Sequence, residues 1–263
     1  MHSRAEAAPS LLYLPDLASA PHEFMLEGPE AHYLARVVRA RTGESVRATD
    51  GAGRVAVLEV IESRPGLRLR RVSLETCTRT RGLTLAIGAP EGDRAEWLVE
   101  KAAEFAASAI VPLDCERGVW RGFRPDRLER LAIAGMRQSL SPFRVRIAGP
   151  ITISAWLAGL PKEGGRFEGS PLGGPVSELA APALGDAFVV IGPSSGFAAG
   201  ERKMLSENGF TPIAFAVGRL RTETAGLAAL AWWAAGDPGL VNPASSLVAP
   251  HGTQPPSLQP PSS

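Results

Sequence analysis

Cysteine is scarce in this sequence of 263 residues, and long apolar runs are missing from it. The two cysteines, Cys77 and Cys115, form neither a CxxC pair nor a grouping with histidine, so neither a disulfide framework nor a metal site is expected. The longest apolar run, residues 225–235, is too short to cross a bilayer. The first residues also lack the basic-then-apolar order of a signal peptide. These absences predict a cytoplasmic protein with no metal and no membrane contact.

Net charge is low as well, at +1 at pH 7, which by itself gives no indication of nucleic-acid binding. The charge is nevertheless unevenly distributed, because residues 117–146 carry eight arginines against Asp126 and Glu129, a local net charge of +6. Such a run is typical either of a solvated helix face or of a surface that contacts RNA phosphates. The charge pattern alone leaves both interpretations open.

The first 80 residues have the pattern of a small β-domain. A proline near its start and an apolar side predict a short amphipathic helix over residues 29–41, with Val37 on the apolar side. Alternating apolar residues at 45–49 and 54–61 flank the turn sequence DGAG, which is a strong hairpin signal, and the alternation resumes at 67–72. One helix and several antiparallel strands predict a small β-barrel, an architecture that often binds nucleic acid.

From residue 81 onward, strand patterns alternate with helical patterns, which predicts a parallel sheet covered on both faces. In the first helix, Trp97, Leu98 and Phe105 are expected to face inward. Loops around one short strand near Phe167 are expected at 159–182. The predicted strands are residues 83–90, 109–113, 187–192 and 213–217, and the predicted helices are residues 93–107, 125–139, 199–208 and 222–235.

Three glycine-containing loops follow the carboxyl ends of predicted strands, where open α/β sheets bind ligands. They are residues 168–174, 192–197 and 217–225. Each loop taken singly is more commonly an ordinary turn, but their convergence in one half of the sheet favours a binding site. A phosphate site in the second loop is disfavoured, because neither the Walker spacing with its lysine nor GxGxxG occurs there.

The third loop also carries chemical groups to the start of an apolar helix. Arg221 and Glu223 supply a cation and a carboxylate, and Thr222 and Thr224 supply hydroxyls. The alternative interpretation is helix capping, with either threonine at the N-cap and Glu223 in the first turn. The two interpretations are compatible.

Five segments together match a known pattern. They are HYLARVVRARTGESVRATDGAG (32–53), GDRAEWLVEKAAEFAASAIVPL (92–113), RQS (137–139), VIGPSSGF (190–197) and VGRLRTETA (217–225). Through them, residues 10–236 resemble the RsmE-type ribosomal RNA methyltransferases, which methylate N3 of a uridine in small-subunit ribosomal RNA. The last segment is the most specific of the five.

The resemblance implies an α/β fold with a PUA-like, RNA-binding β-barrel over residues 1–80 and a SPOUT methyltransferase domain over 81–236. The composition of residues 237–263, which is dominated by proline, serine, glycine and glutamine, predicts a disordered tail. The resemblance also implies a parallel sheet with a C-terminal trefoil knot, which no sequence pattern predicts. S-adenosylmethionine is the implied cofactor, and ribosomal RNA of the small subunit is the implied partner. A homodimer is expected, both from the resemblance and from the apolar side chains of the last helix, which are Leu227, Leu230, Trp232 and Trp233.

The resemblance also assigns residues to roles. Arg221 is expected to stabilise a uracil anion and Glu223 to orient it or the substrate. A glycine-lined apolar slot suits a cofactor that has no phosphate. The expected cofactor-binding residues are Leu172, Gly192, Gly196, Val217, Gly218, Leu220 and Thr222. The expected RNA-binding residues are Arg36, Arg39, Arg94, Lys101, Arg124, Arg127 and Arg130.

The sequence departs from the family pattern at several of these elements. Ser194 and Ser195 stand where the family has glutamate and glycine, Glu91 replaces a lysine, and Arg137 replaces a glutamate. The loop after Gly218 is two residues shorter. The alternative function is therefore a divergent RNA-binding protein of the same fold that has lost cofactor binding and catalysis.

Overall fold

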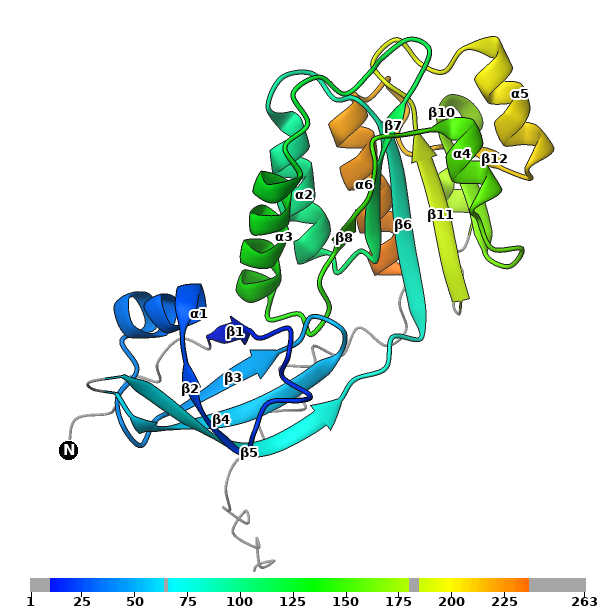
Figure 1. The fold of residues 1–263 in the computed structure, drawn as a ribbon. Helices are drawn as coiled ribbons and strands as arrows, with labels where there is room; N and C mark the ends of the chain where they lie inside the picture. Colours follow the sequence, from blue (N-terminus) through cyan, green and yellow to red (C-terminus); the bar gives the residue numbers. More distant parts are fainter. Residues whose placement is uncertain (1–9, 64–65, 180–184, 237–263) are drawn as a thin grey trace, which may run out of the picture.

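The computed structural model describes residues 10–63, 66–179 and 185–236, so the predicted disordered tail lies outside the described residues. The chain forms a curled β-sheet followed by a parallel sheet with helices on both faces (Figure 1). None of the helices in the described ranges is long and apolar enough to span a membrane. The predicted fold class is confirmed in both parts.

The N-terminal sheet has five strands in the order β1-β3-β4-β5-β2. The predicted hairpin is confirmed, because β3 and β4 pair antiparallel on either side of the DGAG turn. Buried leucines such as Leu12, Leu58 and Leu69 fill the inside of the curled sheet. The strands are β1 (Leu11–Tyr13), β2 (Glu23–Leu26), β3 (Ser45–Thr49), β4 (Arg54–Glu62) and β5 (Leu67–Thr76).

The helix that covers this sheet differs from the prediction. It begins as α1 (Gly28–His32), continues as the π-helical segment η1 (Tyr33–Val38), and ends at Arg39, whose φ is +56°. The wider turn of a π-helix rotates side chains away from the positions expected for 3.6 residues per turn. Val37, predicted on the apolar side, is accordingly 66% exposed.

The C-terminal sheet has seven strands, in the order β12-β10-β11-β6-β7-β8, with β9 also paired to β7. All of its pairings are parallel, as the alternation of strands and helices predicted. The trefoil knot stays a prediction. The strands are β6 (Arg81–Gly88), β7 (Ala109–Asp114), β8 (Arg146–Ile147), β9 (Ile151–Thr152), β10 (Gly165–Pro175), β11 (Gly185–Ile191) and β12 (Thr211–Ala214).

Helices cover both faces of this sheet (Figure 1). On one face Leu98 and Leu230 are buried against Leu85, and on the other Trp156 and Leu205 are buried beside β6 and β11. The first face carries α2 (Arg94–Glu104), α3 (Pro125–Ser139) and α6 (Thr222–Ala235). The second face carries α4 (Ile153–Ala158) and α5 (Ala199–Glu207), and the 3-10 turn η2 (Val176–Glu178) follows β10.

Several details correct the predictions for this domain. The strand near Phe167 is not short, because β10 runs for 11 residues. The strand expected at 213–217 ends at Ala214, and α4 occupies a segment for which no helix was predicted. Trp97 is 41% exposed rather than inward, because the buried side of α2 consists of Leu98, Val99, Ala102 and Ala103.

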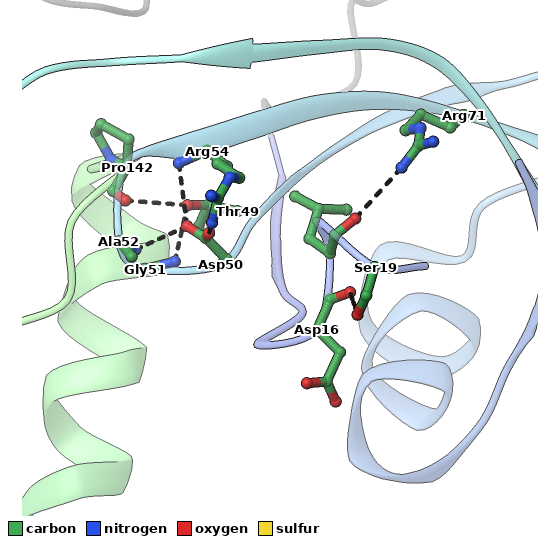
Figure 2. Close-up of polar contacts among 10 residues, drawn as sticks. Asp16, Ser19, Thr49, Asp50, Gly51, Ala52, Arg54, Arg71 and Pro142 are labelled. Atoms are coloured by element: carbon green, nitrogen blue, oxygen red, sulfur yellow. Dashed lines mark hydrogen bonds and ion pairs between the residues drawn. The ribbon is translucent and has the colours of Figure 1, made fainter. Parts of the chain in front are cut away.

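The two sheets meet where the DGAG turn lies against the segment after α3 (Figure 2). The Pro142 carbonyl accepts hydrogen bonds from Thr49 Oγ1 at 3.0 Å and from the Gly53 amide at 3.1 Å. Asp50 closes the turn by accepting from the amides of Ala52 and Arg54. A Cβ on Gly53, whose φ is +107°, would lie 2.5 Å from the backbone oxygen of Cys77, the residue after β5. Glycine is therefore required at this contact.

A second contact joins the two domains at Arg137. Its guanidinium is ion-paired with Glu30 of α1 and lies 4.6 Å from the centre of the Tyr33 ring. Burial lowers the pKa of Arg137 from its usual value. The arginine that departs from the family pattern therefore serves the junction between the domains, where it has an acidic partner.

Candidate active site

A cavity of about 380 Å³ lies at the carboxyl ends of β10, β11 and β12. All three loops that the sequence indicated contribute to its walls, through residues 168–172, residues 191–197, and residues 215–216, 218–220, 222 and 225. The parallel pairing of β10 with both β11 and β12 brings these loops together at one edge of the sheet. This is the edge at which α/β sheets bind ligands.

Six of the seven expected cofactor residues line this cavity, and Val217 does not. The Val217 side chain is fully exposed to solvent, at 111% of its reference area. The six that line the cavity are Leu172, Gly192, Gly196, Gly218, Leu220 and Thr222. The structure thus gathers most of the expected set, and cofactor binding by these residues stays a prediction.

The apolar floor of the cavity explains its glycines. A Cβ on Gly169 would lie 2.3 Å from Ile191 Cδ1, and one on Gly192 would lie 3.3 Å from the Phe197 ring. Any larger residue at these positions would displace the floor or fill the space above it. The Thr222 hydroxyl donates to the Gly192 carbonyl at 3.1 Å, which ties the start of α6 to the loop after β11.

A carboxylate that sequence reasoning missed also faces this cavity. Glu168 of β10, paired with Val190 near the end of β11, is 8% exposed, and its nearest cation is Arg202 Nε at 4.0 Å. Burial raises the pKa of Glu168, and the charge of Arg202 offsets only part of that effect. A buried carboxylate with so distant a partner favours a ligand that brings a positive charge. The available signal was an acidic residue at the start of the first glycine-containing loop, directly after Phe167.

A second cavity of about 340 Å³ adjoins the first. Arg221 and Glu223, the two expected catalytic residues, line this second cavity together with Glu91. Arg219 lies between the cavities, where its guanidinium donates to the Ser194 carbonyl. The residues common to both cavities are Ser194, Arg219, Leu220 and Thr222.

Arg221 and Glu223 have contrasting environments. Arg221 is exposed, and among the described residues its guanidinium makes no hydrogen bond or ion pair. Glu223 is 4% exposed and is ion-paired with Arg94 of α2. The expected capping by a threonine is wrong, because Arg221 occupies the N-cap without a side-chain bond and Thr222 donates to Gly192 instead. The Arg221 guanidinium therefore remains unengaged at the second cavity, whereas the Glu223 carboxylate is held in place by Arg94.

The expected RNA-binding residues do not form one surface. Arg36 and Arg39 are exposed on the N-terminal domain, whereas Arg94 is engaged with Glu223. Lys101 Nζ lies 2.7 Å from Glu104 Oε1, with a second carboxylate close by, and this contact raises its pKa. The Lys101 ammonium therefore stays charged, but it is already paired with carboxylates of its own helix.

The arginines at the start of α3 are partly paired. Arg124 and Arg127 both donate to Glu96 of α2, and these contacts lower the pKa of the Glu96 carboxyl. Arg130 is exposed and donates to the Asp126 carbonyl at 3.2 Å. One carboxylate between two arginines leaves a net positive charge at this place.

Two family models match the chain: an RNA methyltransferase domain over residues 78–234 and an RNA methyltransferase PUA domain over residues 26–69. Ribosomal RNA small subunit methyltransferase E of Mycobacterium bovis is 27% identical over 241 residues, which cover 84% of this chain and 89% of that protein. The protein of the same name from Bacillus subtilis is 25% identical over 225 residues, covering 79% and 88%.

Solved structures give the same result. A probable rRNA-methyltransferase from Porphyromonas gingivalis is 29% identical with a TM-score of 0.77, covering 87% of this chain and 98% of that one. A ribosomal RNA small subunit methyltransferase E from Neisseria gonorrhoeae, bound to S-adenosyl methionine, is 25% identical with a TM-score of 0.72, covering 85% and 96%. With a family model that spans more than half of its length, this chain belongs to the RsmE family of RNA methyltransferases.

Proposed function

We propose that the protein transfers a methyl group from S-adenosylmethionine to N3 of a uridine in small-subunit ribosomal RNA. The observation that carries this proposal is the pair of adjoining cavities with a shared wall. The glycine-lined one suits the cofactor, and the one that contains Arg221 and Glu223 suits the base. The ribosomal substrate is supported by the names of the relatives from Mycobacterium bovis and Bacillus subtilis.

The residues of the first cavity fit this cofactor. Its volume of about 380 Å³ is in the range of small-molecule sites, and its floor is apolar. The backbone at Gly192 and Gly218 is open to an adenosine, and Glu168 offers a buried negative charge to a cationic ligand. When bound, S-adenosylmethionine supplies an electrophilic methyl group on a positively charged sulfur.

At the second cavity, the residues of the chain act on the base. Uracil N3 must lose its proton to solvent before its lone pair can form the new bond to carbon in place of the carbon–sulfur bond, and the resulting negative charge spreads onto the two carbonyl oxygens of the base. Arg221 has no partner in the described residues, so its guanidinium is free to donate to such an oxygen. Glu223, held by Arg94, presents a carboxylate that orients the ring. Positioning of this kind contributes much of the rate in an in-line transfer.

The alternative function is an RNA-binding protein that has lost cofactor binding. It was suggested by Ser194 and Ser195, which depart from the family pattern in the GPSSG loop. In the structure, Ser195 Oγ donates to the Arg117 carbonyl at 2.9 Å and the Ser194 carbonyl accepts from Arg219. The two residues thus brace the loop, and the cavity remains open beside them. This geometry favours the enzyme.

Calorimetric titration with S-adenosylhomocysteine tests the cofactor site, and two matched variants sharpen it. A Cβ on Gly218 or on Gly200 meets no atom within 4 Å, so the fold accommodates a side chain at both positions. Only Gly218 lines the cavity. Gly218→Leu is expected to weaken binding at least roughly tenfold, about 1.4 kcal/mol, at an unchanged melting temperature. Gly200→Leu should bind like the wild type. If the wild-type protein shows no binding at millimolar ligand, the RNA-binding alternative holds instead.

We also propose that the protein forms a dimer, through a surface other than the last helix. The last helix is covered within the chain, since Leu230 and Trp233 are buried and Trp232 packs against Phe167, so the original argument from its apolar side chains is wrong. The exposed aromatic on this side of the domain is instead Trp97 of α2. Tryptophan is enriched at protein–protein interfaces relative to the rest of the surface, and the family resemblance implies a symmetric pair.

Light scattering at micromolar protein is expected to give the mass of a dimer. Trp97→Ser should shift the equilibrium towards the monomer, because it removes an apolar anchor from the interface. Val72→Ser on the N-terminal sheet, which removes another exposed apolar side chain, serves as the matched control. A monomeric wild type, or equal masses for all three proteins at every concentration, would count against this interface.

A further inference from the structure

A third cavity, of about 420 Å³, lies between the loop after β6 and the loop that leads into α3. Its walls come from residues 89–90 and 92–93, the first turn of α2, residues 119–124, and Leu128 of α3. Its volume is comparable to that of either cavity of the candidate active site.

The inner wall of this third cavity is aromatic and firmly held. The rings of Trp120 and Phe123 meet edge to face, with centroids 5.9 Å apart. The Trp120 amide donates to Asp114 Oδ1 at 3.1 Å and its indole Nε1 donates to the Ile87 carbonyl at 3.2 Å. Both polar groups of the tryptophan are thus engaged by the sheet, which fixes the plane of the ring. The neighbouring Val119 is 52% exposed.

The rim of the cavity is positively charged. Arg121 is exposed, and the Arg124 side chain is 64% exposed even while it contacts Glu96 at 3.2 Å. Arg127 shares the same carboxylate. An aromatic pair beside two exposed guanidinium groups matches the two parts of a nucleotide, since the base stacks on a ring and the phosphate attracts a cation.

The position of the cavity connects it to the candidate active site. The loop of residues 89–93 separates the second and third cavities, with Glu91 lining the second and Pro90, Gly92 and Asp93 lining the third. A strand of RNA with its target base in the second cavity therefore passes over this loop to reach the third.

We propose that the third cavity binds one nucleobase of single-stranded RNA adjacent to the target uridine, stacked against the wall of Trp120 and Phe123, with Arg121 and Arg124 on its phosphate. This inference rests on the proposed function for the choice of RNA and of the neighbouring target. It assigns the local excess of arginine to one nucleotide site rather than to a general phosphate-binding face. Sequence-specific RNA-binding proteins commonly recognise splayed, unstacked bases.

The test compares two RNA probes by fluorescence anisotropy in the absence of cofactor: a decamer of uridine and a decamer of the same length that is abasic at every position. Both carry the same phosphates, so their affinity ratio measures base contacts only. Wild-type protein is expected to prefer the uridine decamer at least tenfold. Phe123→Leu keeps an apolar side chain but loses the ring, and should reduce this preference to about a third or less.

A matched pair of arginine variants separates this site from overall charge. Arg121→Ala and Arg146→Ala each remove one positive charge from the same basic segment, but Arg146 lies on β8, at the amino end of the sheet. Arg121→Ala is expected to lower the affinity for both decamers and to flatten the dependence of that affinity on salt. Arg146→Ala is expected to change neither quantity. Arg121 is exposed, so this variant remains informative if Phe123→Leu fails to fold.

Three outcomes overturn the inference. The first is an equal affinity of the wild type for the two decamers, and the second is an undiminished preference in folded Phe123→Leu. The third is a change in the mass of Phe123→Leu by light scattering with no change in base preference, which would make the cavity an interface between two copies. Cofactor titration is independent of these measurements, so failure of the methylation proposal alone leaves base-dependent binding intact.

Discussion

Replacing Arg221 with alanine is expected to lower the single-turnover rate of RNA methylation roughly a hundredfold, as the loss of one preorganised donor does in other enzymes. Arg221 lines the second cavity and has no partner among the described residues, so its guanidinium is available to a developing anion. The measurement is transfer of a labelled methyl group from saturating S-adenosylmethionine to RNA, with enzyme in excess.

Two further readouts distinguish catalysis from bracing of α6. RNA affinity and the melting temperature of Arg221→Ala should match the wild type, because the exposed side chain makes no hydrogen bond or ion pair in the described parts of the chain. Arg221→Lys should recover only part of the rate, since an ammonium lacks the planar fork of donors. A lower melting temperature with an unchanged rate would reassign Arg221 to a structural role, and a wild-type rate would eliminate the catalytic assignment.

The ion pair between Arg94 and Glu223 is expected to show an asymmetric response to substitution. Arg94→Ala leaves a carboxylate that is 4% exposed without its cation, which should cost about 2 kcal/mol of stability, less than for a fully buried pair because Arg94 is half exposed. Glu223→Gln leaves only an arginine that can turn towards water, so its cost should stay below about 1 kcal/mol. Urea denaturation of both variants measures the two free energies of unfolding.

The double variant completes this test. Arg94→Ala combined with Glu223→Gln removes the uncompensated charge, so it should be more stable than Arg94→Ala alone. The sequence predicted Arg94 as a phosphate contact, and the structure offers the alternative that it positions Glu223. Under that alternative, Arg94→Ala lowers the methylation rate and leaves the salt dependence of RNA binding unchanged. Additive stability effects, or a flattened salt dependence, would restore the original assignment.

Local patterns predicted several elements closely. The helix expected at 125–139 is α3 (Pro125–Ser139), and the helix expected at 222–235 is α6 (Thr222–Ala235). The signals for these helices lie in the local sequence. Helix α3 has a proline at its first position, and neither helix contains a further proline. The hairpin at the DGAG turn was equally local, since turn chemistry and strand alternation lie within one segment.

Elsewhere, tertiary contacts overrode the local pattern. Val37 follows helical spacing in the sequence, but the π-helical turn moves it into solvent. Trp97 is apolar and was expected to face inward, yet the smaller Leu98, Val99 and Ala102 form the buried side of α2. Which side of a helix is covered depends on the neighbours it meets, and here these are α3 and α6.

By itself, the sequence determined the hairpin at the DGAG turn, the ranges of α3 and α6, the change from antiparallel strands to alternating strands and helices, and the three glycine-containing segments, because each depends on residues close together in the chain. Only the tertiary structure decided which side chains meet. Glu223 and Arg94 are 129 positions apart and form a pair because α6 packs against α2. Glu168 faces the first cavity, and Val217 points away from it, because strand pairing and loop geometry fix their directions. No periodicity encodes such contacts, since their partners are selected by the packing of the whole sheet.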